Sequence, residues 1–79
     1  MYLSEVISIL KSSPIGLKAR RLAWNEVPNI EAFIIYDAYM GEFTYTRRQK
    51  FDEDTIMTSC LRFYPSLSDA AYDDWEIFE

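Results

Sequence analysis

Hydrophobic residues near the N-terminus recur with the period of an α-helix. Four of them fall at positions i, i+3, i+4 and i+7, and so share one helical face: Leu3, Val6, Ile7 and Leu10. Ser4 stands where a side chain can cap the first turn. The residue before a proline is disfavoured in helical backbone, so Pro14 ends the helix. We therefore predict a helix over about residues 4–12, followed by a turn at Ile15-Gly16.

The centre of the chain has the composition and the period of two strands. Glu31–Asp37 contains the β-branched and aromatic run of a core strand. Ala38–Gly41 follows as a turn, in which Gly41 can take positive φ. From Phe43 to Arg48, aromatic and polar residues then alternate. The sequence therefore predicts a β-hairpin.

Weaker patterns predict the other elements. We expect extended backbone from Leu17 to Trp24, a loop to Asn29, and a solvated connection from Arg47 to Asp54. A further strand over Ile56–Phe63, a turn at Pro65–Ser68, a short helix over Asp69–Asp73 and a terminal strand over Trp75–Phe78 complete the chain. The expected fold class is α+β in one domain, residues 1–79. In it, the N-terminal helix packs on a small antiparallel sheet, and a short helix precedes the C-terminal strand.

Composition narrows the function further. Aromatic residues make up 16% of only 79 residues, so some must lie at a subunit contact or line a ligand pocket. Cys60 is the single cysteine and there is no histidine, which makes a disulfide within the chain impossible and a zinc site improbable. The commonest general base near neutral pH is missing as well. We expect a protein with no catalytic residue, cofactor or metal. Since no signal peptide or membrane span is visible, we expect it in the cytoplasm.

Charge is unevenly distributed along the chain. The net charge is −5; residues 1–51 carry seven bases and five acids, whereas residues 52–79 carry Arg62 alone against eight acids. Direct nucleic-acid binding is therefore disfavoured. Two interpretations stay open: the acidic half imitates a nucleic acid, or the arginines concentrate at one local anion site.

Two short blocks combine a large aromatic residue, hydrogen-bonding side chains and a rigid turn. The first is Arg21-Leu22-Ala23-Trp24-Asn25; the second runs from Phe63 through Pro65, Ser66 and Asp69 and is closed by Asp74-Trp75. Aromatic faces can stack on a base, arginine can pair with a phosphate, and polar side chains can bind ribose hydroxyls.

Each of these residues also has a purely structural interpretation. Trp24 and Trp75 can be core residues. Ser66 and Asp69 can cap the short helix. Arg21 can pair with Asp74 and so stabilise the fold.

The two blocks, in this order, resemble a phage and prophage family, the Thoeris anti-defence sponges of the second type. The family was long known as a domain of unknown function. Its members show Arg-x-x-Trp-Asn after an N-terminal helix, then an aromatic residue, x-Pro-Ser-x-x-Asp, four residues and Asp-Trp. This chain departs from the pattern at Glu26, where the family usually has glycine, and at Phe63, where it usually has tryptophan. About half of the chain is covered.

The resemblance implies a homo-oligomer, dimer or tetramer, that sequesters a cyclic ADP-ribose-type immune signal without catalysis in the host bacterial cytoplasm. Some relatives are described as anti-CRISPR proteins. Under this hypothesis Trp24 and Phe63 stack on the base and Arg21 meets a phosphate. Asn25, Ser66 and Asp69 bind ribose hydroxyls, while Pro65, Asp74 and Trp75 support the pocket wall.

Two other functions stay open. A protein–protein inhibitor of the anti-CRISPR kind would use the acidic half, including Asp52, Glu53 and Asp54, against a nucleic-acid-binding effector. A small structural or packaging protein would use its aromatic residues only for assembly.

Overall fold

The computed structural model describes residues 1–12 and 16–79, and its first element is the amphipathic helix. Helix α1 spans Leu3–Ser12 and buries Leu3, Val6 and Leu10, which confirms the predicted helix. It begins earlier than expected: Ser4 lies inside the first turn, and the Glu5 carboxylate accepts the backbone N–H of Tyr2 at 3.4 Å. The predicted stop at Pro14 and the turn residue Ile15 lie outside the described residues.

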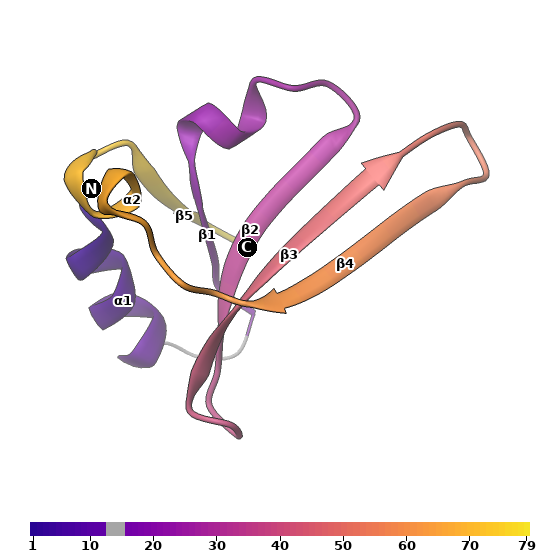
Figure 1. Cartoon of the computed structure of the whole chain (residues 1–79). Helices are drawn as coiled ribbons and strands as arrows, with labels where there is room; N and C mark the ends of the chain where they lie inside the picture. Colours follow the sequence, from indigo (N-terminus) through magenta and orange to yellow (C-terminus); the bar gives the residue numbers. More distant parts are fainter. Residues whose placement is uncertain (13–15) are drawn as a thin grey trace.

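Five antiparallel strands form one sheet in the order β4-β3-β2-β1-β5 (Figure 1). The strands are β1 (Lys18–Arg21), β2 (Ile30–Asp37), β3 (Glu42–Lys50), β4 (Ile56–Arg62) and β5 (Trp75–Phe78). β5, the last strand along the chain, pairs with β1, the first. The α+β architecture expected from the sequence is therefore confirmed.

The central hairpin of β2 and β3 turns at residues 38–41, as predicted. Its strands pair from Asp37↔Glu42 to Ile30↔Gln49. Gly41 has φ +70°, and the Asp37 carboxylate accepts the backbone N–H groups of Tyr39 and Met40. A left-handed residue and a carboxylate that caps the turn fix the hairpin locally.

The predicted solvated connection from Arg47 to Asp54 is wrong over its first half. β3 continues to Lys50, which pairs with Ile56 of β4, and the turn is confined to residues 51–55. The charged residues keep the alternation of the strand, so their side chains reach solvent while their backbone groups pair with β4.

The extended segment expected from Leu17 to Trp24 also ends early. β1 stops at Arg21, and Leu22–Asn25 form a short 3₁₀ helix, η1. The Leu22 N–H donates to the Asp74 carbonyl at 2.8 Å, which holds this corner beside the start of β5. The 3₁₀ turn brings Trp24 onto the hydrophobic core.

The short C-terminal helix begins two residues before its predicted start. Helix α2 spans Leu67–Ala71, with Ser66 as its N-cap. The Asp69 N–H donates to the Ser66 hydroxyl at 3.1 Å, and the Asp69 carboxylate accepts the Ser66 N–H at 2.9 Å. This reciprocal capping box fixes the start of the helix at Ser66.

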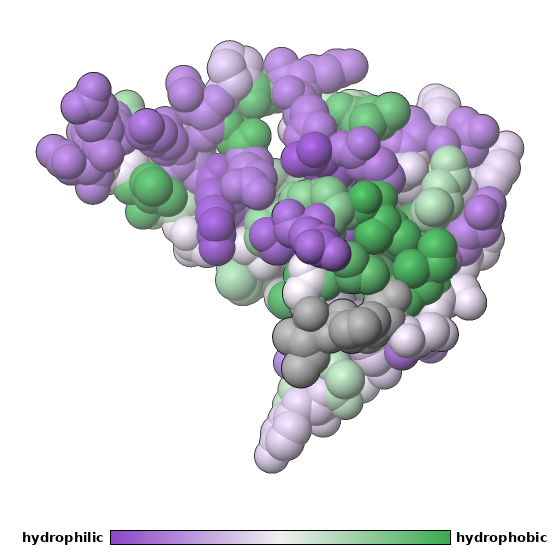
Figure 2. All heavy atoms as spheres, turned by 180° about the vertical axis from the view of Figure 1, so that it is seen from behind, coloured by the Kyte–Doolittle hydropathy of each residue, from purple (hydrophilic) through white to green (hydrophobic). Residues whose placement is uncertain are grey.

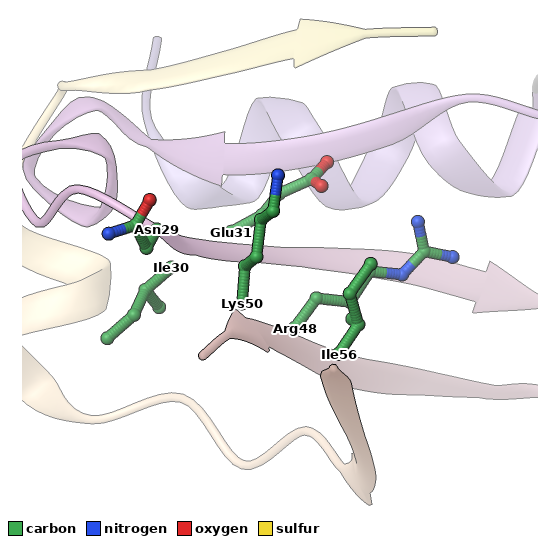
Figure 3. Close-up of a pocket in the computed structure, with 6 residues that line it drawn as sticks. All are labelled: Asn29, Ile30, Glu31, Arg48, Lys50 and Ile56. Carbon is green, nitrogen blue, oxygen red and sulfur yellow. The ribbon is translucent and has the colours of Figure 1, made fainter. Parts of the chain in front are cut away.

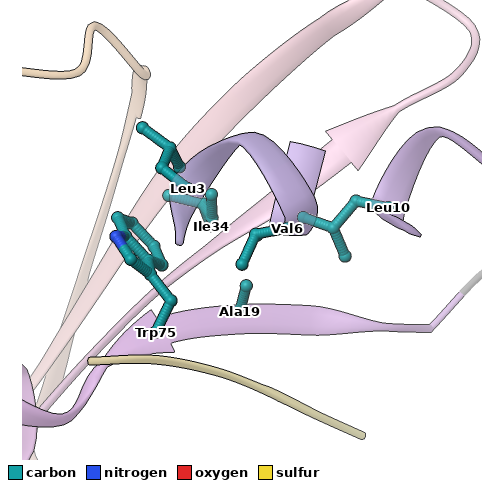
Figure 4. Packing of buried hydrophobic residues seen from close by; sticks show 6 residues of the cluster. All are labelled: Leu3, Val6, Leu10, Ala19, Ile34 and Trp75. Carbon is teal, nitrogen blue, oxygen red and sulfur yellow. The ribbon is translucent and has the colours of Figure 1, made fainter. Parts of the chain in front are cut away.

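The hydrophobic core lies between α1 and one face of the sheet. Val6 and Ile34 are fully buried, and α1 packs its apolar stripe on β1, β2 and β5 (Figure 4). We call this side of the sheet the helix face. The opposite side, on which Lys18, Phe33 and Arg48 lie by alternation, is the open face. The core cluster contains Leu3, Val6, Leu10, Ala19, Ile34 and Trp75.

The helices are too short to cross a membrane. Within residues 1–12 and 16–79, none combines the length and the apolar character that a transmembrane span needs. The longest helix described, α1, has 10 residues, about half the number that spans a bilayer.

Candidate functional site

The two sequence blocks meet beside the end of the sheet. Arg21 ends β1 and Trp24 lies in η1, whereas Asp69 lies in α2 and Trp75 begins β5. The ring centroids of Trp24 and Trp75 are 5.1 Å apart, and the Trp75 indole N–H donates to the Asp69 carbonyl at 2.9 Å. Segments more than 40 residues apart in the sequence therefore form one cluster, which we call the two-block cluster.

Arg21 is held between two carboxylates at the centre of the two-block cluster. Its Nε lies 3.0 Å from Asp74 Oδ1, its Nη2 3.3 Å from Asp74 Oδ2, and its Nη1 3.6 Å from Asp69 Oδ1. Only 13% of the Arg21 side chain is exposed, and its guanidinium stacks 4.8 Å from the Tyr72 ring centroid. The bidentate pair with Asp74 is the stronger of the two contacts.

The same contacts set the protonation of the pair. The hydrogen bond from Arg21, with its positive charge, lowers the pKa of the Asp74 carboxyl, although burial acts in the opposite direction. The hydrogen bond to Asp74 raises the pKa of Arg21. A general acid or base at neutral pH needs a pKa near 7. Asp74 is shifted away from that value, so the geometry does not favour acid–base chemistry by this carboxylate.

Four aromatic rings pack edge to face in the two-block cluster. Trp75 is 3% exposed and contacts Trp24 and Phe63, and Trp24 also meets Tyr45 of β3 at a centroid distance of 5.5 Å. Trp75 is therefore a core residue with no free face for stacking. Trp24 and Phe63 are only partly buried, so both retain some accessible ring surface.

The other predicted site residues lie on the surface. Asn25, Pro65 and Ser66 are exposed. Ser66 and Asp69 use their side chains for the capping box of α2, and Asp69 also contacts Arg21. The capping role considered for Ser66 and Asp69 is therefore confirmed. Their role in ligand binding stays a prediction.

Acid should weaken the Arg21–Asp74 pair. The folded-state pKa of Asp74 lies below the value of about 3.9 for an unperturbed Asp. The contribution of the pair to stability is therefore present above that value and is lost as the pH falls through the folded-state pKa. We expect Asp74→Asn to reduce the free energy of unfolding by about 1 kcal/mol at pH 7, since the pair is partly exposed. The difference between the variant and the wild type should shrink as the pH falls through the folded-state pKa of Asp74, as measured by urea denaturation at pH 7 and at acid pH.

Asp73→Asn is the matched control for this titration. The Asp73 side chain is exposed and forms no ion pair within the described residues. Its substitution should leave the free energy of unfolding unchanged at both pH values. A difference between Asp74→Asn and the wild type that does not shrink with falling pH would contradict the assignment to the ion pair.

Sequence reasoning missed a second feature, a hollow of about 610 Å³ bordered by open-face residues. Alternation along β1, β2 and β3 was the available signal, because it places cationic and apolar residues on one face. Its lining includes Leu17, Lys18, Phe33, Ile35, Arg48 and Thr58. None of the predicted ligand-binding residues lines this hollow.

A smaller hollow of about 380 Å³ lies beside the first. It is lined by residues of β2, β3 and β4 and of the loop before β2 (Figure 3). Arg48 borders both hollows, and Lys50 adds a second cation to the smaller one. Seen from behind, hydrophilic side chains lie above a hydrophobic area of the surface and partly overlie it (Figure 2).

The acidic residues of the C-terminal half do not lie together. Asp52, Glu53 and Asp54 lie in the turn between β3 and β4, whereas Asp69 and Asp74 lie near β5, at the other edge of the sheet. The latter two are already paired with Arg21. These positions do not make one continuous acidic surface within a single copy of the chain.

The fold and the two-block cluster define a small α+β protein with an ion-paired aromatic cluster at one end of its sheet. Among residues 1–12 and 16–79, no group of three or more Cys, Asp or Glu side chains is arranged to hold a metal ion. No protein-family model, curated protein or solved structure matches the chain. The family resemblance therefore depends on the residues of the two blocks alone.

Proposed function

We propose that this protein binds a small cyclic nucleotide signal of the cyclic ADP-ribose type and sequesters it, without catalysis, as a phage counter-defence sponge in the bacterial cytoplasm. The observation that carries the proposal is the contact between the two blocks on which the family resemblance depends. Arg21 of the first block pairs with Asp69 and Asp74 of the second. A ligand at this junction would touch both blocks at once.

The geometry suggests how a nucleotide would be held. The contact from Arg21 to Asp69 is the longer one, at 3.6 Å, so a phosphate can replace Asp69 there while Asp74 keeps the guanidinium in place. The accessible parts of Trp24 and Phe63 would contact the base, and the exposed Asn25 and Ser66 would bind ribose hydroxyls. Once the phosphate has replaced it at Arg21, the Asp69 carboxylate would also accept a hydrogen bond from a ribose hydroxyl.

The edge strand β4 offers a place for a second copy of the chain to pair in this proposal. β4 is an edge strand, and all seven of its residues are exposed. Paired antiparallel with itself around Ser59, it would place Met57 opposite Leu61 of the other copy; these side chains are 60% and 65% exposed in the single chain. Such two-fold pairing joins two sheets into one and supports a homo-oligomer.

Isothermal titration tests the proposal. Cyclic ADP-ribose isomers and cyclic dinucleotides are added to the protein, and we expect at least one to bind with a sub-micromolar Kd, equivalent to about 8 kcal/mol. The ligand should be recovered unchanged after denaturation, and light scattering on the same samples should show an oligomer. If none of these compounds binds at high micromolar protein concentration, the proposal is wrong.

A pair of neighbouring surface variants assigns that binding to the two-block cluster. Asn25→Ala removes a predicted ribose contact from an exposed position and should weaken binding about tenfold, as expected for the loss of about 1.4 kcal/mol. Glu26→Ala changes the adjacent exposed residue, which has no predicted role, and should leave the Kd unchanged. Equal affinities of the two variants would place the ligand elsewhere.

A further inference from the structure

We propose that the larger hollow, on the open face, is a second binding site, for a small anion that carries an apolar body. This site is separate from the two-block cluster and does not depend on the function proposed above. Its volume of about 610 Å³ lies within the range of about 300–1,000 Å³ usual for small-molecule sites.

The floor of the hollow is apolar. Leu17, Ile35 and Tyr36 line it, together with the ring of Phe33. Phe33 is only 4% exposed although it lies on the face that α1 does not cover. Side chains of neighbouring strands shield it instead, among them Phe78 at a centroid distance of 6.2 Å. A ligand would therefore contact the aliphatic walls and the edge of this cluster, and an apolar body would gain by burial.

Cations outnumber acids around this apolar floor. Lys11, Lys18 and Arg48 line the hollow, and Asp37 is the acidic residue among its lining. The Asp37 carboxylate already accepts two backbone N–H groups of the β2–β3 turn. In a chain with a net charge of −5, this is a local excess of positive charge.

Among the described residues, Lys18 and Arg48 form no ion pair with a carboxylate, although Glu31 lies opposite Arg48 in the sheet register. On the same face, Arg20 pairs with Glu76 at 2.6 Å, and Arg62 pairs with Glu42 at 2.7 Å. Within residues 1–12 and 16–79, neither Lys18 nor Arg48 has such a partner. A bound anion would supply the missing countercharge.

Lys18 and Arg48 converge on one ring. The Lys18 Nζ lies 5.0 Å from the Phe33 centroid, and the Arg48 Cζ lies 5.8 Å from it. Two positive charges near one ring repel each other. An anion bound between them would attract both and so offset this repulsion. The hydroxyl group of the exposed Thr58, also in the lining, can donate to the same anion, whereas the Thr46 hydroxyl already contacts Cys60 Sγ at 3.6 Å.

The adjoining hollow extends the positive surface. Arg48 borders both hollows, and Lys50 projects beside it from β3 (Figure 3). Glu31 is the acidic residue in the lining of this second hollow. The anionic group of a ligand therefore belongs near Arg48, where the two hollows adjoin, and the apolar body belongs in the larger one.

Fluorescence titration with anilinonaphthalene sulfonate tests the site, because this probe is itself an anion with an apolar body. We expect saturable binding to the wild type with one probe per chain. Lys18→Ala and Arg48→Ala should each weaken it about tenfold. Arg47→Ala is the matched control, since Arg47 is the neighbouring exposed residue of β3 on the helix face; it should bind like the wild type.

A second pair of variants separates the hollow from general surface charge. Thr58→Trp fills the hollow from an exposed position of β4 and should abolish saturable binding, whereas Ser59→Trp, on the other face of the same strand, should not. Circular dichroism of each variant verifies that the fold is retained. Unchanged probe affinity in Arg48→Ala and Thr58→Trp, or equal losses in both members of either pair, would overturn the proposal.

Competition against the bound probe identifies the class of ligand. Adenosine monophosphate, decanoate and inorganic phosphate represent a nucleotide, an acyl carboxylate and a bare anion. Displacement by either of the first two, but not by phosphate at the same concentration, supports a site for an anion with an apolar body. Displacement by phosphate alone, or by none of the three, contradicts it.

Discussion

Replacing Trp75 with alanine should remove most of the free energy of unfolding at 25 °C. Trp75 is 3% exposed, packs against Trp24 and Phe63, and donates its indole N–H to the Asp69 carbonyl. Truncation of a buried aromatic residue of this size costs about 3–5 kcal/mol, and a domain this small has a total stability of about 5 kcal/mol. Urea denaturation followed by circular dichroism should show a transition that begins at or near zero urea.

Two further variants make this prediction specific. Trp75→Phe keeps a ring in the core but removes the indole donor, so its stability should fall between those of the wild type and Trp75→Ala. Leu67→Ala truncates a side chain of α2 that is 91% exposed and should change the free energy of unfolding by less than about 0.5 kcal/mol. If Trp75→Ala proved as stable as Leu67→Ala, the assignment of Trp75 to the core would be wrong.

The second large effect concerns Arg21. In Arg21→Ala, Asp69 and Asp74 lose their countercharge and Tyr72 loses the guanidinium stacked on its ring. Loss of a partly buried ion pair with two carboxylates should reduce the free energy of unfolding by about 2–3 kcal/mol, less than for a fully buried pair. Urea denaturation at pH 7 measures this loss.

Arg21→Lys tests the geometry of the same ion pair. Lysine keeps the charge but cannot make the bidentate contact with Asp74. Its loss of free energy of unfolding should therefore be about half of the loss in Arg21→Ala. Arg47→Ala removes an exposed arginine of β3 and serves as the control, with an expected change below about 0.5 kcal/mol. A loss in Arg47→Ala as large as in Arg21→Ala would show that net charge, and not the pairing, determines stability.

The sequence predicted most of the fold because the strongest patterns are local. The spacing of Leu3, Val6 and Leu10 defines α1, and the run from Phe33 to Tyr36, with Gly41 in the turn, defines the central hairpin. The errors lie where tertiary contacts determine the backbone conformation. Leu22–Asn25 leave the extended conformation so that Trp24 reaches Tyr45 and Trp75. Alternation in a short window does not contain that information.

The candidate site was predictable in part. The pairing of Arg21 with Asp74 and the capping role of Ser66 were among the structural interpretations of the two blocks, and both are present. The open-face hollow was not predicted. Its cations, Lys18 and Arg48, are 30 residues apart and meet only because β1 and β3 lie on either side of β2. That strand order cannot be read from a single sequence.

The arrangement of the sheet has a consequence for synthesis on the ribosome. The core joins α1, the first element, to Trp75 of β5, the last, and β1 lies between β2 and β5. While β5 is still inside the exit tunnel, β1 has a free edge and the apolar stripe of α1 lacks one of its partners. The fold is therefore complete only after β5 has left the exit tunnel, and until then the edge of β1 and part of the apolar stripe of α1 stay exposed.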